Sequence, residues 1–274
     1  MRRELAIVAA FLIPLLSTSA PAHESLEEHS EVAFDGQEAL RVSQAAVGRR
    51  LSDYSFLNRS EEEVSLSDYS GKPLLISLIY TSCYYSCSVF TRYLGEIVDV
   101  AREALGEGSF SVVTIGFDAV NDSPGRMALY ASGQGIDDPD WAFLSGDVET
   151  LQALTSELGF TYAASPKGFD HMAQVTVIDA NGAVYRQVYG DRFEPPALVE
   201  PLKELVFGLD PTSSRIDRWV DNVRLFCTIY DPSTGRYRFD YSIFVGLIIG
   251  ALCLAAIAIF IVRAWRQSST PLPH

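Results

Sequence analysis

Cys83 and Cys87, two cysteines at a predicted strand-to-helix turn, constrain this sequence more than any other feature. The apolar run Leu74–Tyr80 before them is typical of a buried strand, and the segment Val89–Leu105 after them is predicted to be a helix. Cysteines four residues apart place both sulfurs on one face of the first helical turn. The N–H groups at a helix start favour thiolate over thiol. Such a pair can close a disulfide, hold a soft metal ion, or do both at different times.

The elements that follow predict an α/β fold with a mixed sheet. Strand and helix alternate three times and are followed by a β-hairpin around Asn181-Gly182, a strong turn signal, and by the amphipathic helix Glu194–Phe207. This order implies parallel strands with helices on both faces of the sheet. A cysteine pair at the first strand-to-helix turn makes it a thioredoxin-like arrangement. The later strands are expected at Phe110–Asp118, Trp141–Leu144, Ala173–Ile178 and Ala183–Tyr189.

The first part of the chain is expected to lie outside this domain. Residues 1–22 have a basic start, an apolar stretch and a small-residue end, Ala20-Pro21-Ala22, which is the pattern of a cleavable signal peptide. Residues 23–49 are predicted to be an acidic N-terminal arm, and residues 50–208 the domain itself. The net charge of −14, from 21 Lys and Arg against 35 Asp and Glu, argues against nucleic acid as a partner, since phosphates need a basic surface.

The last part of the chain is expected to anchor the domain in a membrane. The segment Tyr241–Val262 contains no charged residue and is long enough to span a bilayer as a helix. Because Arg263 and Arg266 follow directly, the positive-inside rule places the tail, residues 263–274, in the cytoplasm. Residues 209–240 would then be a juxtamembrane segment. The two ends together predict a single-pass protein of the bacterial inner membrane whose soluble domain faces the periplasm.

His171 is a candidate third partner of the two cysteines. Thioredoxin-type oxidoreductases have two residues between their cysteines and usually a cis-proline before the strand that leads into the hairpin. Here three residues separate Cys83 from Cys87, and His171 occupies the neighbourhood of that proline. The expected fold would bring it beside the first turn of the helix. Two thiolates and one imidazole suit Cu(I), and with small adjustment Cu(II), whereas zinc normally has a fourth ligand.

Several further motifs combine with the cysteine pair. They are, with the Cys83-x3-Cys87 spacing, Phe117-Asp118, Asp122-Ser123-Pro124, Asp170-His171 and Val177–Gly182. In this combination, over Arg50 to Phe207, the chain resembles the Sco/SenC family of thioredoxin-fold copper chaperones. The resemblance implies that copper is bound by Cys83, Cys87 and His171. It also implies a role in cytochrome c oxidase assembly, either delivering copper to the dinuclear copper site or reducing the cysteines there. The expected partner is the copper-site subunit of the oxidase or another copper chaperone.

The chain departs from the family pattern in two ways, which leaves other functions open. Tyr84 and Ser88 stand where the family usually has prolines, and the membrane anchor is C-terminal rather than N-terminal. The alternative is a thiol–disulfide oxidoreductase for exported clients, in which Cys83 attacks and Cys87 resolves. The three-residue spacer and the missing cis-proline count against it. A thioredoxin-class peroxidase would need a Pro-x3-Thr-x2-Cys-like setting, which the segment before Cys83 does not supply.

Two further cysteines lie outside the predicted domain. Cys227, in the juxtamembrane segment, is either an unpaired structural cysteine or an additional thiol or copper partner. Cys253 lies in the middle of the predicted span and is expected to be an apolar helix residue without a chemical role.

Overall fold

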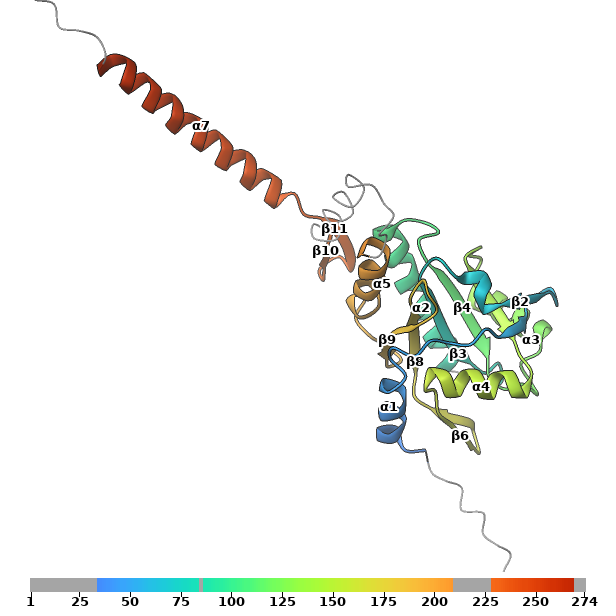
Figure 1. Cartoon of the computed structure of the whole chain (residues 1–274). Helices are drawn as coiled ribbons and strands as arrows, with labels where there is room; N and C mark the ends of the chain where they lie inside the picture. The colour runs from blue at the N-terminus through green and yellow to red at the C-terminus, as the bar shows by residue number, and fades with distance from the viewer. Residues whose placement is uncertain (1–33, 84–85, 209–227, 269–274) are drawn as a thin grey trace, which may run out of the picture. The chain divides into compact units, whose positions relative to one another are not determined.

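The structure is a computed structural model that describes residues 34–83, 86–208 and 228–268 (Figure 1). The predicted signal peptide and Cys227 lie outside the described residues. The elements, in chain order, are α1 (Gly36–Gln44), β1 (Ser55–Leu57), β2 (Glu63–Ser65), the 3-10 helix η1 (Leu66–Tyr69), β3 (Leu74–Ile79), α2 (Ser86–Leu105), β4 (Ser111–Gly116), α3 (Pro124–Gln134), β5 (Trp141–Ser145), α4 (Val148–Leu158), β6 (Tyr162–Ser165), β7 (Gly168–His171), β8 (Gln174–Ile178), β9 (Val184–Tyr189), α5 (Pro196–Gly208), β10 (Thr228–Asp231), β11 (Arg236–Phe239) and α7 (Ser242–Ser268).

One seven-stranded mixed sheet organises the domain, in the order β2-β1-β5-β4-β3-β8-β9. β3 pairs in parallel with β4, and β4 with β5, whereas β8 runs antiparallel to both β3 and β9. β6–β7 and β10–β11 form separate two-stranded sheets. The predicted α/β fold, a thioredoxin-like mixed sheet with flanking helices, is therefore confirmed.

The core lies along the central strands β3, β4 and β8, where every residue is buried. Strands covered on both faces read as continuous apolar runs rather than alternating ones, and this is how Leu74–Ile79 appears in the sequence. Its side chains pack with helix residues such as Leu94 of α2 and Leu154 of α4, both fully buried. The turn after β3 thus follows a strand that is buried along its whole length.

Helix α1 packs on the domain, although it lies in the segment expected to be an acidic arm. Its Ser43 is fully buried and donates its hydroxyl hydrogen to Gln174 Oε1 at 2.7 Å. A Cβ at Gly159 would lie 2.8 Å from the Ser43 Cα, so the helix approaches the end of α4 as closely as a glycine allows. The packed part of the chain therefore begins before Arg50.

The chain reaches His171 through a short hairpin. Residues Tyr162–Ser165 and Gly168–His171 pair as the antiparallel hairpin β6–β7. Gly168 has a φ of 118°, and a Cβ there would lie 2.8 Å from the ring of Tyr80. Because both strands are short and begin after an irregular stretch, the sequence shows no clear alternation to predict them. The hairpin gives His171 a defined place at a strand end.

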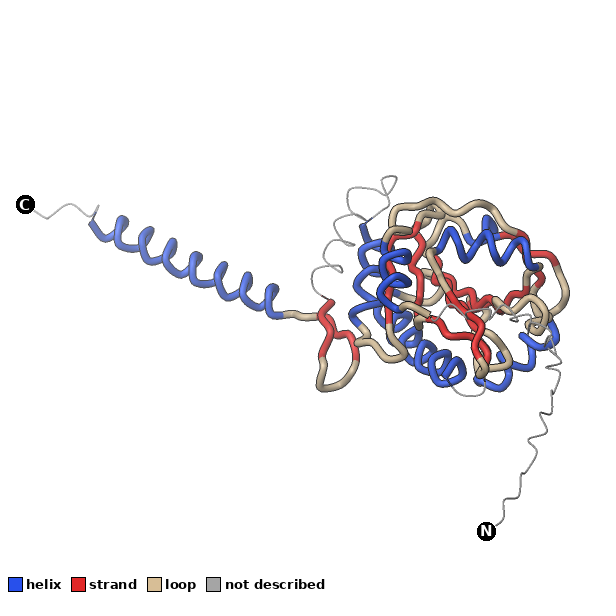
Figure 2. The backbone as a smooth tube through the Cα atoms, turned by 90° about the horizontal axis from the view of Figure 1, so that it is seen from below, coloured by secondary structure: helices blue, strands red, loops and turns tan. Residues whose placement is uncertain are grey.

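The C-terminal part contains a hairpin and one long helix. β10–β11 packs against α2 and α5: Lys203 donates its Nζ hydrogen to Thr228 O at 2.6 Å, and Tyr237 donates its hydroxyl hydrogen to Glu200 Oε1 at 2.9 Å. Figure 2 shows α7 as one continuous helix. Its segment Phe244–Trp265 is long and apolar enough to cross a membrane, as the sequence predicts.

Candidate metal centre and dithiol

The turn that carries Cys83 is fixed by backbone and carboxylate hydrogen bonds. After β3 ends, the Cys83 N–H donates to Tyr80 O at 3.1 Å. Thr81 donates both its backbone N–H and its hydroxyl hydrogen to Asp122 Oδ1, each at 2.7 Å. The position of Cys83 therefore depends on a residue that lies far away in the sequence.

Asp122 ties together the two loops that follow β3 and β4. Its carboxylate is 2% exposed, and its Oδ2 accepts the Asp118 N–H at 2.9 Å. Burial raises the pKa of this carboxyl, although its hydrogen bonds from Thr81 and Asp118 oppose the shift. A Cβ at Gly116 would lie 2.4 Å from the Asp122 Cβ, so this arrangement requires glycine there. The sequence contains Asp122 in a motif but does not reveal this contact.

Cys83 lies where the first turn of α2 can stabilise its thiolate. Its Sγ accepts the Cys87 N–H at 3.3 Å and lies 3.1 Å from Ser86 Oγ. Burial alone would raise the pKa of this thiol, but the hydrogen bonds of Ser86, Cys87 and Tyr80 outweigh burial and lower the pKa to about 7. At neutral pH a large share of Cys83 is therefore the nucleophilic and metal-binding thiolate.

The pKa of Cys87 shifts in the opposite direction to that of Cys83, although the two residues are only four positions apart. Its side chain is 4% exposed. Burial raises the pKa of this thiol to about 12, and its side-chain hydrogen bond to Cys83 acts in the same direction. In the reduced state Cys83 therefore loses its proton first while Cys87 keeps its own. Both cysteines are free thiols in this structure.

His171 ends β7 in an aromatic setting. Its ring centroid lies 5.4 Å from that of Phe160 and 5.5 Å from that of Phe117. Burial lowers the pKa of the imidazole, so the neutral ring is favoured at pH 7. Nδ1 lies 3.2 Å from Met172 O, and because a carbonyl only accepts, Nδ1 carries the hydrogen. This tautomer leaves the lone pair of Nε2 for a metal ion.

His171 and Cys87 line the same small cavity, of about 40 Å³. Cys83 is not part of its lining, although Ser86, its hydrogen-bond partner, is. Among the described residues, no three His, Cys, Asp or Glu side chains lie close enough together to hold a metal ion. The structure thus brings all three predicted ligands to one region, but not into a closed coordination site. Asp191, which the sequence did not single out, also lines this cavity.

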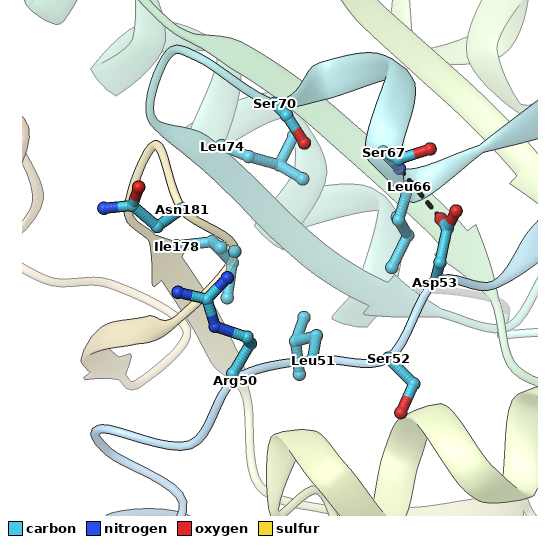
Figure 3. A pocket seen from close by; sticks show the side chains of 11 residues that line it. Arg50, Leu51, Ser52, Asp53, Leu66, Ser67, Ser70, Leu74, Ile178 and Asn181 are labelled. Atoms are coloured by element: carbon cyan, nitrogen blue, oxygen red, sulfur yellow. Dashed lines mark hydrogen bonds between the residues drawn. The ribbon is translucent and has the colours of Figure 1, made fainter.

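A second cavity, of about 120 Å³, lies at the other end of β3, beside Leu74 (Figure 3). Its one carboxylate, on Asp53, accepts the Ser67 N–H at 3.0 Å. Figure 3 shows Arg50 and Asn181 on the opposite side of this cavity. Because the cysteine turn follows the far end of β3, this cavity does not contribute to the candidate site.

Comparison with known proteins finds relatives with a similar sequence or a similar fold. A thiol peroxidase of Bacillus subtilis is 29% identical over 178 residues, which cover 64% of this chain and 95% of the peroxidase. A SCO1/SenC family lipoprotein of Bacillus anthracis has a similar structure, with a TM-score of 0.53, 20% identity and coverage of 58% of this chain and 95% of that one. The copper-bound ScoI of Arabidopsis thaliana superposes with a TM-score of 0.51 and 16% identity. The superposition covers 58% of this chain and 98% of that one.

At these identities the two solved structures support the fold alone. The family model described as SCO1/SenC matches residues 43–206, which run from the end of α1 into α5 and include the seven-stranded sheet and the cysteine turn. This match covers more than half of the chain and includes Cys83, Cys87 and His171. The chain therefore belongs to the SCO1/SenC family.

Proposed function

We propose that this protein is a membrane-tethered copper chaperone in which Cys83, Cys87 and His171 bind the copper ion. The observation that carries the proposal is the shared cavity of Cys87 and His171, next to a turn where the pKa of Cys83 is lowered to about 7. Two soft sulfurs and one neutral imidazole nitrogen suit Cu(I) in particular. Membership of the SCO1/SenC family and the copper-bound state of the similar ScoI support this choice of metal.

The unequal thiols suggest how copper would enter. Because the pKa of Cys83 is lowered to about 7, Cys83 is partly thiolate at neutral pH and would be the first sulfur to meet the ion. Cys87 would then lose its proton as the ion approaches, because a thiol binds copper as thiolate. His171 would complete the site through Nε2. Both cysteines must be reduced beforehand, which couples copper loading to the redox state of the pair.

We propose the dinuclear copper site of a cytochrome c oxidase as the client, reached from the periplasmic side of the membrane. SCO1/SenC membership supports the oxidase. The signal-peptide pattern at residues 1–22 and the candidate membrane helix Phe244–Trp265 support a protein that is exported and held at the bilayer. Arg263 and Arg266 favour a cytoplasmic C-terminus.

Thiol–disulfide exchange is the second candidate, and the two unequal pKa values support it as well. The Cys83 thiolate would attack a client disulfide, forming a mixed disulfide and releasing one client thiolate. Cys87 would then lose its proton and attack Cys83 Sγ, closing the intramolecular disulfide and releasing the second thiolate. The client gains the two electrons that the pair loses. The resemblance to a thiol peroxidase also supports thiol chemistry at Cys83.

Copper titration of the reduced full-length chain in detergent tests the first candidate. We expect about one copper ion per chain, and His171→Ala should weaken Cu(II) binding about tenfold or more and change its EPR spectrum. His274→Ala, which removes a histidine of the tail, is the control and should leave both unchanged. If His171→Ala binds copper like the wild type while Cys83→Ser abolishes only disulfide exchange, the chaperone function is wrong and the exchange function stands.

A further inference from the structure

We propose that Asp191 supplies a fourth, oxygen ligand to the bound copper and thereby favours Cu(II) over Cu(I). The inference rests on the proposed copper-binding function. Asp191 lies 20 positions after His171 in the chain but lines the same cavity as His171 and Cys87. No other carboxylate among the described residues lines that cavity.

One end of the loop that carries Asp191 is fixed to the strand beside His171. The Gly190 N–H donates to Ala173 O at 3.0 Å, which extends the β8–β9 pairing by one step. Gly190 has a φ of 102°, a conformation that residues with a side chain rarely adopt, and it turns the chain at the end of β9. Ala173 itself lines the cavity, so the turn places the next residue, Asp191, at its edge.

The other end of the loop is fixed to the helix that carries Cys87. Tyr93 of α2 donates its hydroxyl hydrogen to Phe193 O, and the two rings pack edge to face with centroids 5.7 Å apart. Phe193 is 9% exposed. A short loop held at both ends therefore runs from the backbone of Ala173, two residues after His171, to the helix that carries Cys87, and Asp191 lies between the two attachments.

The Asp191 carboxylate is available for a ligand. Its side chain is exposed, and within the described part of the chain it makes no hydrogen bond or ion pair. Asp122 differs, because its carboxylate is buried and already accepts from Thr81 and Asp118. Asp191 therefore adds an uncommitted oxygen donor to the cavity that Cys87 and His171 line.

Charge and ligand hardness both give this carboxylate a preference for Cu(II). Two thiolates give a site with bound Cu(II) no net charge and a site with bound Cu(I) one negative charge. An additional carboxylate is therefore repelled only by the Cu(I) site. Carboxylate oxygen is also a harder donor than sulfur, and Cu(II) accepts nitrogen and oxygen ligands in tetragonal sites. Asp191 should therefore lower the reduction potential of the bound copper.

The test compares Asp191→Asn with Glu194→Gln in the full-length chain. Glu194 is also exposed and lies on the same connection, but it does not line the cavity, so it controls for the loss of one surface charge. For Asp191→Asn we expect about tenfold weaker Cu(II) binding, a changed Cu(II) EPR spectrum, a higher Cu(II)/Cu(I) potential and unchanged Cu(I) affinity. Glu194→Gln should match the wild type in all four measurements.

Three outcomes separate this inference from the proposed function. If Asp191→Asn has the wild-type EPR spectrum and potential while Cys83→Ser loses copper, Asp191 is not a ligand but the chaperone function stands. If Glu194→Gln shifts the potential as much as Asp191→Asn and neither changes the spectrum, the effect is surface charge and the ligand role is wrong. If the reduced wild type binds no copper, the proposed function and this inference both fail.

Discussion

The Cys87 N–H donates to Cys83 Sγ at 3.3 Å, so the first turn of α2 stabilises the charge of one cysteine through the backbone of the other. The side chains have opposite properties, because the pKa of Cys83 is lowered to about 7 and that of Cys87 is raised to about 12. Both candidate functions need this asymmetry. A chaperone needs one thiolate that captures metal at neutral pH, and a thiol reductase needs one nucleophile and one protected resolving thiol.

The first prediction concerns the reactivity of the reduced protein with pH. The alkylation rate should rise as the pH increases through about 7 and then level off, because the thiolate of Cys83 is the reactive form and its fraction grows above the pKa. Cys87 should react only slowly over the same range, since its raised pKa keeps it protonated. Mass spectrometry after iodoacetamide pulses measures both sites. A common midpoint for the two cysteines would contradict the asymmetry.

The second prediction isolates the role of Ser86 at Cys83. Ser86→Ala removes the hydroxyl that lies 3.1 Å from Cys83 Sγ, and the midpoint of alkylation should move to higher pH. Ser88→Ala is a matched control on the same helical turn, because Ser88 Oγ accepts from Gln134 Nε2 and, within the described part of the chain, makes no hydrogen bond to either thiol. Its midpoint should stay near that of the wild type. Equal midpoints for both variants would mean that the helix backbone alone stabilises the thiolate.

The third prediction tests the close approach of Gly116 and Asp122. Gly116→Ala should destabilise the fold by about 1–3 kcal/mol, because a Cβ 2.4 Å from that of Asp122 forces the buried carboxylate to move. Gly95→Ala is the control: its Cβ would meet no atom within 4 Å, and in the middle of α2 it should stabilise by about 0.5–1 kcal/mol. Urea unfolding of the reduced protein measures both. Similar free energies of unfolding for the two variants would show that Asp122 can relax easily.

Much of this fold can be predicted from local patterns. Buried strands such as β3 read as continuous apolar runs, and Ser123 followed by Pro124 marks the start of α3, where the Ser123 hydroxyl accepts the Arg126 N–H. The antiparallel pair β8–β9 follows from Asn181-Gly182. The hairpin β6–β7 and the docking of α1 could not be predicted, because they depend on close contacts of Gly168 and Gly159 with distant residues.

The sequence points to candidate site residues but does not predict their geometry. The spacing of Cys83 and Cys87 indicates two sulfurs on one turn, and the fold order indicates that His171 lies near them. Neither pattern shows that the two thiols differ in protonation, since that difference comes from burial and from hydrogen bonds within a few ångströms. Asp191 has no signal in the sequence, because it reaches the cavity only through a turn held to Ala173.

The fourth prediction concerns the hairpin β10–β11, which lies beyond the family match. Lys203 is 4% exposed and donates to Thr228 O, so Lys203→Met leaves that carbonyl without its partner and should cost about 1–3 kcal/mol. We expect faster tryptic cleavage at Arg236 than in the wild type. Glu103→Gln, which removes only the exposed ion pair with Arg236, should change the rate little. Equal cleavage of all three proteins would show that Lys203 does not hold the hairpin.

The fifth prediction tests whether α7 anchors the chain. The segment Phe244–Trp265 is exposed, apolar and long enough to cross a bilayer, so the expressed protein should remain with membranes after washing with alkaline carbonate. A chain that ends at Asp240 should be released as soluble protein, because it keeps the packed hairpin but loses the helix. Replacing Ile248 and Leu252 by lysine should also release the full-length chain, since charges near the centre of a span are costly. Retention of the shortened chain in the carbonate pellet would mean that another part of the protein holds it at the membrane.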